Sequence, residues 1–133
     1  DVSDFLTEYM EDVADPKKPV VFEYTVEERI FRRTFEALQK ALNEYAFSFS
    51  RNKRLSAGFS IYHYEAFTIG LQAVLESLDL NNIATIAKLK DVLEGIKHDV
   101  SFIKITSGGG KNSPGPLNQR ISFVEDRLRN AFA

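Results

Sequence analysis

Apolar residues recur every three or four positions in several stretches of the chain, with charged residues between them. This spacing puts the apolar residues on one helix face and predicts amphipathic helices over residues 3–13, 25–46, 83–97 and from Pro116 onward. Residues 60–78 differ, because additional apolar residues leave little of the circumference strongly polar. A helix of that kind belongs in the middle of a bundle. The pattern therefore predicts an all-α fold, in which one domain (1–133) forms a bundle of about five helices around a central buried helix at about 60–78.

Residues typical of helix ends support several of these boundaries. Thr25 to Glu28 have the S/T-x-x-E form of a capping box, which would open the second helix. Ser60, Asn81 or Asn82, and Asp99 each stand where an N-cap belongs, the last one before a short turn. Residues 47–59 are predicted to be a linker, and one short extended segment near 20–24 is kept open.

Two residues of the central helix carry more specific expectations. Gly70 costs about 1 kcal/mol relative to alanine in a helix interior. The usual compensation is the close approach of a second backbone, so we expect a tight helix crossing at Gly70. Glu65 lies in the first turn, where its charge interacts favourably with the helix N-terminus. We further expect a structural ion pair between Glu65 and Arg51, Arg54 or Arg120, which would hold the linker and the last helix to the centre.

Composition excludes several classes of function. The chain contains no cysteine, which rules out disulfides, thiol nucleophiles and cysteine-based zinc sites. Charges interrupt every apolar run before it reaches the roughly 20 residues needed to span a bilayer. We therefore expect a cytoplasmic protein without a membrane contact. The chain begins with Asp1 rather than methionine, and we expect it to be a domain excised from a larger protein.

The net charge of −2 does not indicate a general nucleic-acid binder, but the charges are unevenly distributed. Arg51, Lys53 and Arg54 form a basic group in the linker, close in sequence to Phe59, Tyr62 and Tyr64. Basic and aromatic side chains together form surfaces that bind the phosphates and bases of nucleic acids. Exposed charges beside aromatic residues of the core are the simpler interpretation, so both interpretations stay open.

The segment Gly108–Gly110 followed by Lys111 invites comparison with phosphate-binding loops. The Walker pattern fails, however, because Ile105 occupies the first glycine position and Asn112 follows the lysine. Lys111 remains a candidate for an opportunistic anion or nucleic-acid contact near a helix N-terminus. A plain flexible connector is the alternative role for this loop.

The two histidines give no indication of catalysis or metal binding. Neither His63 nor His98 has a second metal ligand at helical spacing, apart from single carboxylates. Arg54 precedes His63 by nine residues, which is too far for the motif of HEPN-type ribonucleases. We therefore expect no catalytic residue, no metal ligand and no cofactor in this chain.

The order of several short motifs resembles that of a known family. The motifs are Phe31 and Phe35, Asn52-Lys53-Arg54, Gly58-Phe59-Ser60, Tyr64-Glu65-Ala66, Phe102, Ser107-Gly108-Gly109, and Arg120 leading a helix through Val124 and Leu128. From about Thr25 onward, this order resembles the C-terminal helical region of GmrSD-type proteins. That group is prokaryotic and carries a nucleotide-using ParB-like domain upstream, and many members restrict modified phage DNA.

The resemblance implies a helical accessory or interaction domain of a restriction or phage-defence protein. Such a domain would be non-catalytic alone and would contact DNA or the upstream ParB-like domain. A stand-alone helical protein-interaction or oligomerisation domain is the alternative, with its oligomeric state open. A small helical nuclease is the third hypothesis.

Overall fold

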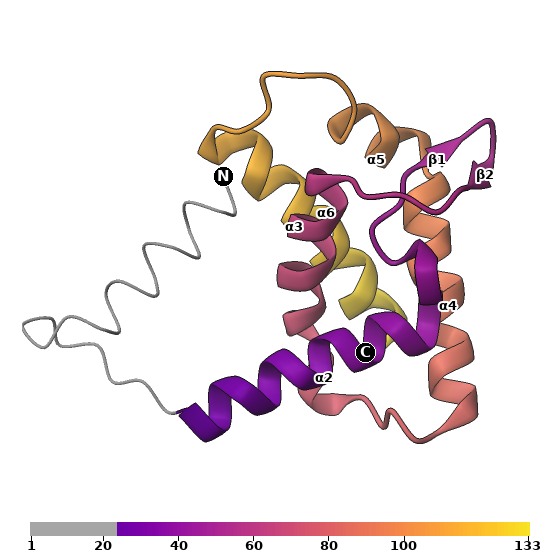
Figure 1. Cartoon of the computed structure of the whole chain (residues 1–133), viewed down its shortest axis with the longest axis vertical. Coiled ribbons are helices and arrows are strands. Elements are labelled where there is room, and N and C mark those ends of the chain that lie inside the picture. The colour runs from indigo at the N-terminus through magenta and orange to yellow at the C-terminus, as the bar shows by residue number, and fades with distance from the viewer. Residues whose placement is uncertain (1–23) are drawn as a thin grey trace, which may run out of the picture.

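The structure, a computed structural model, describes residues 24–133 (Figure 1). Its elements are α2 (Tyr24–Leu42), η1 (Asn43–Tyr45), β1 (Ser50–Arg51), β2 (Arg54–Leu55), α3 (Ile61–Gly70), η2 (Leu71–Ala73), η3 (Leu75–Ser77), α4 (Ile83–His98), α5 (Val100–Ile105) and α6 (Pro114–Ala131). Helices make up 71% of the structure, and the prediction of an all-α bundle of about five helices is confirmed. The helix expected over residues 3–13 and residues 20–23 of the extended segment lie outside the described residues. Tyr24, the last residue of that segment, is helical.

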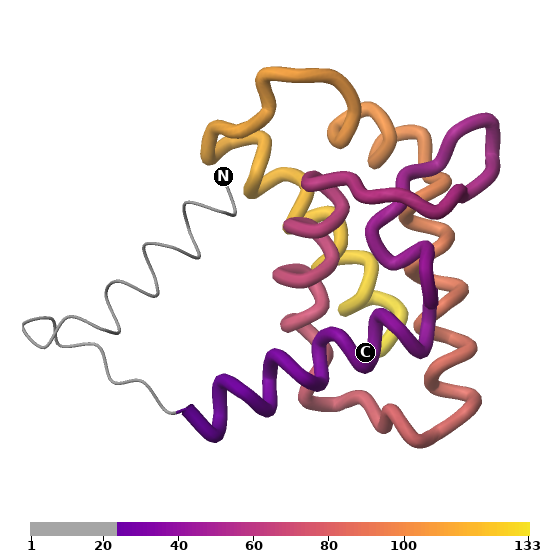
Figure 2. The backbone as a smooth tube through the Cα atoms, in the orientation of Figure 1, coloured from indigo at the N-terminus to yellow at the C-terminus, as the bar shows by residue number. Residues whose placement is uncertain are grey.

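The helix α3 is packed between other elements of the bundle, with α6 alongside it and α2 passing across its end (Figure 1). The helix α4 lies on the side of the bundle away from α3 and packs against α2 (Figure 2). Their apolar side chains form a single core, which includes Leu38, Phe67, Leu93, Phe102 and Leu128. Within residues 24–133, no helix is both long enough and apolar enough to cross a bilayer.

The second half of the predicted central helix is not α-helical. After Gly70 the chain forms two 3₁₀ turns, which are separated by Val74 with φ −129° and ψ −8°. Because the α-helix is interrupted, the carbonyl groups of Leu75 and Leu78 receive no hydrogen bond from an amide four residues later in the chain. The guanidinium of Arg33 donates to both of them instead. Its Nη2 lies 3.0 Å from the oxygen of Leu75 and 2.9 Å from that of Leu78. The prediction of one helix over 60–78 is therefore wrong beyond Gly70, although the segment stays largely buried as expected.

The burial of three residues also differs from what the helical spacing predicts. The apolar spacing places Arg33 on the charged outer face of α2, but the broken helix gives it partly buried carbonyl partners at Leu75 and Leu78. Phe31 is 62% exposed and Ile83 is 87% exposed, although both were expected on inner faces. Phe31 lies in the first half of α2 and Ile83 is the first residue of α4, and in both helices the residues that pack in the core come later. Apolar periodicity places a residue on a face but does not show how far along the helix that face is covered.

Side-chain caps explain most of the helix starts. Ser60 accepts a hydrogen bond from the amide of His63, Asn82 from that of Thr85, and Asp99 from that of Ser101. These caps satisfy amides that have no partner inside the helix, as predicted. The capping box at Thr25 is wrong, because α2 already includes Tyr24. The last helix begins at Pro114, two residues earlier than expected, with Ser113 at its N-cap position.

The predicted linker over 47–59 contains a β-hairpin. Ser50 pairs with Leu55 and Arg51 with Arg54 in antiparallel register. The two residues between the strands, Asn52 and Lys53, both have positive φ, 53° and 62°. Positive φ at both central residues is the conformation of a type I′ turn, which matches the twist of a hairpin. The Asn-Lys sequence gives a weak signal for this turn, because its second position is usually glycine.

Gly70 allows α3 and α6 to cross at close range. A methyl group added at Gly70 would lie 2.7 Å from Cγ1 and 2.8 Å from Cβ of Val124, and 3.4 Å from the carbonyl oxygen of Ile121. Distances below 3 Å require the neighbouring chain to move. The expected tight crossing is thus confirmed, and it takes place between α3 and α6.

We predict that Gly70→Ala destabilises the protein by roughly 2 kcal/mol, because the clash with Val124 outweighs the gain in helix propensity. Gly95→Ala is the matched control, since Gly95 lies within α4 with no atom within 4 Å of an added methyl group. That variant should gain up to about 1 kcal/mol from helix propensity. Urea unfolding followed by circular dichroism measures both, and equal stabilisation by the two substitutions would contradict the tight crossing.

Candidate functional site

The hairpin projects from a base of contacting aromatic rings. The backbone amide of Ser60 donates to the carbonyl of Phe47 at 2.7 Å, which closes the loop between them. The ring of Phe47 lies 5.8 Å from that of Phe59 and 5.0 Å from that of Tyr64, between centroids. Phe35 of α2 contacts the same group at 6.2 Å from Phe47. We call Phe35, Phe47, Phe59 and Tyr64 the aromatic cluster.

The tip of the hairpin is strongly basic. Arg51, Lys53 and Arg54 are exposed, and no acidic residue occurs between Tyr45 and Tyr64. Arg51 and Arg54 are paired directly across the two strands. Like charges in directly opposed positions destabilise a hairpin. A bound anion would relieve this repulsion, so the tip is suited to phosphate groups.

A pocket of about 500 Å³ opens beside the base of the hairpin. The loop and strand β1 contribute one side, the start of α3 a second, and α5 with the following loop a third. Its lining residues are Phe49, Ser50, Phe59, Ser60, Ile61, Tyr62, His63, Ile103, Thr106, Ser107 and Gly108. Among these residues there is no lysine, arginine, aspartate or glutamate, so the pocket combines aromatic walls with hydroxyl groups and one imidazole.

A buried lysine lies behind the imidazole. Lys97, near the end of α4, is fully buried, and its Nζ lies 3.0 Å from Nδ1 of His63. The same ammonium donates to the carbonyl of Ser48 at 2.5 Å and lies 4.6 Å from the ring centre of Phe67. These contacts connect α4 to the loop before the hairpin and to the first turn of α3.

Burial changes the protonation of both groups. The pKa of Lys97 falls from 10.5 to about 7, because burial penalises the charged form. Burial, and next the charge of Lys97, lower the pKa of His63 from 6.5 to about 3. His63 is therefore neutral at physiological pH. When Nδ1 accepts from the ammonium of Lys97, the single ring proton resides on Nε2.

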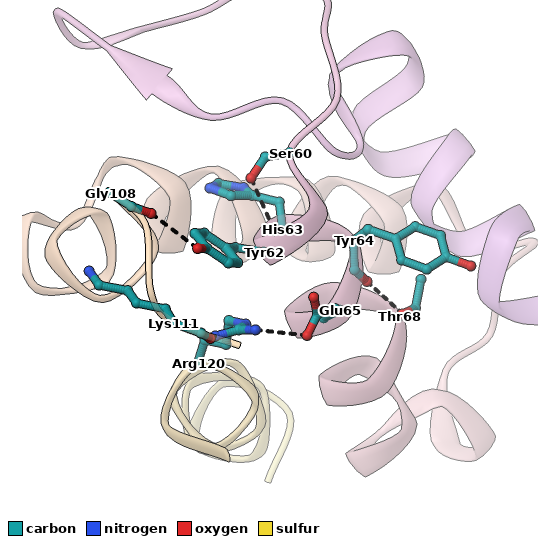
Figure 3. Close-up of polar contacts among 9 residues, drawn as sticks. All are labelled: Ser60, Tyr62, His63, Tyr64, Glu65, Thr68, Gly108, Lys111 and Arg120. Atoms are coloured by element: carbon teal, nitrogen blue, oxygen red, sulfur yellow. Dashed lines mark hydrogen bonds and ion pairs between the residues drawn. The ribbon is translucent and has the colours of Figure 1, made fainter. Parts of the chain in front are cut away.

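Glu65 and Arg120 form an ion pair within the bundle (Figure 3). Arg120 Nη2 lies 2.8 Å from Oε2 of Glu65, and both side chains are 1% exposed. Arg120 also donates from Nη1 to the carbonyl of Lys111 at 2.8 Å, and its guanidinium lies 4.6 Å from the ring centre of Tyr62. Of the partners considered for Glu65, the structure brings Arg120 to it, whereas Arg51 and Arg54 are exposed in the hairpin.

The remaining candidate residues lie apart from one another. The ammonium of Lys111 donates to the carbonyl of Lys104 at 2.6 Å, which connects it to the last turn of α5. His98 contacts the hydroxyl of Ser50 through Nδ1 at 2.7 Å. Across residues 24–133, no group of three potential metal ligands comes together. The contact of Lys111 with an anion stays a prediction.

Lys97 is the residue that the sequence analysis missed. It follows Leu93 by four positions, so it falls on the inner face of α4 defined by Leu89, Leu93 and Ile96. A lysine at an inner-face position was therefore the available signal. The partners of Lys97 come from distant segments, and spacing alone could not identify them.

The comparisons with known proteins give no match. No protein-family model, no curated protein and no solved structure matches this chain.

We predict that Glu65→Gln lowers the free energy of unfolding by about 3 kcal/mol, because it leaves the buried Arg120 without a counter-charge. Glu28→Gln is the control, since Glu28 pairs with Arg32 on the exposed surface of α2. An exposed pair of this kind contributes less than about 1 kcal/mol. Urea unfolding measures both variants, and an equal effect of the two would contradict a structural role for the buried pair.

The lowered pKa of Lys97 makes stability depend on pH. The unfolded lysine keeps its proton up to about pH 10.5, whereas the folded one loses it near pH 7. The unfolded state therefore binds more protons between these values, and stability rises with pH in that window. We predict that the stability of the wild type relative to Lys97→Met increases from pH 7 to pH 10, by up to about 1.4 kcal/mol per pH unit.

The control for this prediction is Lys90→Met, on the exposed side of the same helix. Its stability difference from the wild type should stay constant over the same pH range. Chemical unfolding at each pH provides the values, and parallel curves for the wild type and Lys97→Met would show that Lys97 does not lose its proton on folding.

Proposed function

We propose that this chain is a helical accessory module of a GmrSD-like defence protein and that it contacts nucleic acid through the basic hairpin and the aromatic cluster. The proposal combines the order of sequence motifs with the geometry at the base of the hairpin. Catalysis and nucleotide turnover would then belong to other domains, with an upstream ParB-like domain as the partner within the same protein.

The observation that carries the proposal is the charge of the hairpin tip. Three cations lie within four residues in a segment of twenty residues, 45–64, that has no acidic residue, although the whole chain has a net charge of −2. Arg51 and Arg54 repel each other across the strands, and phosphate groups would neutralise both. Binding of this kind gains free energy from the release of counterions from the nucleic acid.

The aromatic cluster favours a single strand over a duplex. Phe59 of the cluster is 61% exposed, and Phe49, which lies outside the cluster just before strand β1, is 47% exposed. Unpaired bases stack on such rings, whereas the bases of a duplex already stack on each other. A strand whose phosphates follow the hairpin would therefore have its bases within reach of the exposed rings.

A protein-interaction module is the second candidate. It is favoured by two exposed apolar side chains at the two ends of α4, Ile83 at 87% and Val100, in the first position of α5, at 80%. The rest of the helix α4 lies between these two residues in the chain. Light scattering on the purified chain tests this alternative, because a dimer that dissociates on Ile83→Ser would support it.

We predict that replacing Arg51, Lys53 and Arg54 together by glutamine weakens binding to a fluorescein-labelled ten-nucleotide single strand of DNA by at least about tenfold at 50 mM salt. The slope of log K against log salt should fall by about 2, since each lost phosphate contact removes about 0.7 for single strands. Fluorescence anisotropy across a salt series measures both quantities.

The control variant replaces Arg29, Lys90 and Arg129 by glutamine. These residues lie on the exposed faces of α2, α4 and α6, and the substitutions change the net charge by the same amount. Equal weakening by the two triple variants would mean that the total charge alone determines binding. If the wild type fails to bind at tens of micromolar, the proposed contact with nucleic acid is wrong.

A further inference from the structure

We propose that the pocket beside the hairpin receives one unstacked nucleobase, while the phosphates that flank that base lie on Arg51, Lys53 and Arg54. This inference rests on the proposed contact with nucleic acid and specifies how a base is held. The shared ligand chemistry is a nucleobase with a phosphate attached, and it could come from a single strand or from a free nucleotide.

The size and the walls of the pocket suit a planar ring. Its volume of about 500 Å³ falls in the range of small-ligand sites. Phe49, Phe59 and Tyr62 from two separate segments provide aromatic surfaces around it. Stacking on such surfaces is available to every base, because each base has a π face.

The pocket lining is uncharged and the hairpin is cationic, which favours a base inside the pocket and a phosphate outside it. No charged side chain lines the pocket, and its one titratable base, His63, is neutral because burial lowers its pKa to about 3. A phosphate inside would lose its hydration without gaining a counter-charge. Ser50 lines the pocket and Arg51 is the next residue of strand β1, so the cations of the hairpin begin one residue from the pocket wall, outside the lining. A neutral ring inside and an anionic group outside match this arrangement.

His63 supplies a directed hydrogen-bond donor. The His63 side chain lines the pocket although it is only 1% exposed, and when Nδ1 accepts from Lys97 at 3.0 Å, the ring proton lies on Nε2. The ring is held by Phe67 at 5.6 Å and by Phe102 at 5.3 Å, between centroids. A carbonyl oxygen or an unprotonated ring nitrogen on the edge of a base is the matching acceptor.

The far wall of the pocket is fixed by the buried ion pair. The hydroxyl of Tyr62 donates to the carbonyl of Gly108 at 3.0 Å (Figure 3). The other side of the Tyr62 ring is covered by Arg120, which is held by Glu65. These contacts hold Gly108 in the pocket wall, so the pocket exists before any ligand enters and little ordering cost remains.

Three probes test the proposal on the unmodified chain at 50 mM salt. They are a labelled ten-nucleotide poly-dT strand, a ten-unit abasic strand with the same phosphates, and free dTMP as a competitor. We expect the abasic strand to bind at least about fivefold more weakly than poly-dT, because the stacking of one base is lost. Equal binding of the two strands would overturn the base pocket while leaving the phosphate contact of the hairpin in place. Binding of neither strand would overturn the proposed function as well.

Competition with free dTMP shows whether the ligand of the pocket is a free nucleotide or a base of a single strand. If the inhibition constant of dTMP is lower than the dissociation constant of poly-dT, the result would support the pocket with a free nucleotide as its ligand. Weaker competition by dTMP than by unlabelled poly-dT would support it with a single strand as the ligand. Complete absence of competition by dTMP at millimolar concentration, together with equal binding of the abasic strand, would overturn it.

Substitutions then locate the site. Phe49→Ala should remove the difference between poly-dT and the abasic strand, and Phe49→Tyr should keep it, because an aromatic ring remains for stacking. Phe31→Ala is the matched control, because Phe31 is also an exposed phenylalanine but does not line the pocket. Loss of the difference in Phe31→Ala and its retention in Phe49→Ala would place the base outside the pocket and overturn the proposal.

Discussion

The ion pair between Glu65 and Arg120 is the interaction on which the arrangement of the bundle depends. Two charges removed from water cost several kcal/mol each, and their mutual attraction offsets this only when the geometry is held closely. Their contact at 2.8 Å joins the middle of α3 to α6 and requires a particular relative position of the two helices. That position is also the one in which Gly70 meets Val124 without a side chain between them. The polar pair specifies the helix register, and the apolar crossing packs against it.

Buried polar contacts on two sides of the candidate site position the walls of its pocket. On one side Arg120 covers the ring of Tyr62 and donates to the carbonyl of Lys111, and Tyr62 donates to the carbonyl of Gly108, which positions this loop. On the other side Lys97 holds the carbonyl of Ser48 and therefore the start of the hairpin. Buried polar groups of this kind stabilise a structure only when they are partnered. The walls of the pocket are thus connected to the core, although the pocket itself lies at the surface.

The sequence predicted the parts of this structure that depend on local chemistry. Helical periodicity, the caps at Ser60, Asn82 and Asp99, and the close approach at Gly70 all follow from neighbouring residues. The break after Gly70 did not, because its carbonyls are satisfied by Arg33 from α2, more than forty residues earlier in the chain. The hairpin was missed because its turn uses Asn52 and Lys53 rather than a glycine. The pocket depends on His63 meeting Lys97 across 34 residues, and periodicity carries no information about such pairs.

The protonation of the site favours recognition over proton transfer. A general acid or base works best when its pKa lies near the working pH, and that of His63 lies near 3. Lys97 has a pKa of about 7, but it is fully buried and does not line the pocket. At the proposed base site Lys97 would therefore act on a ligand only through His63, whose ring proton lies on Nε2 when Nδ1 accepts from Lys97. A neutral donor held in one orientation discriminates between hydrogen-bonding edges, and this is the property that a site for reading a base requires.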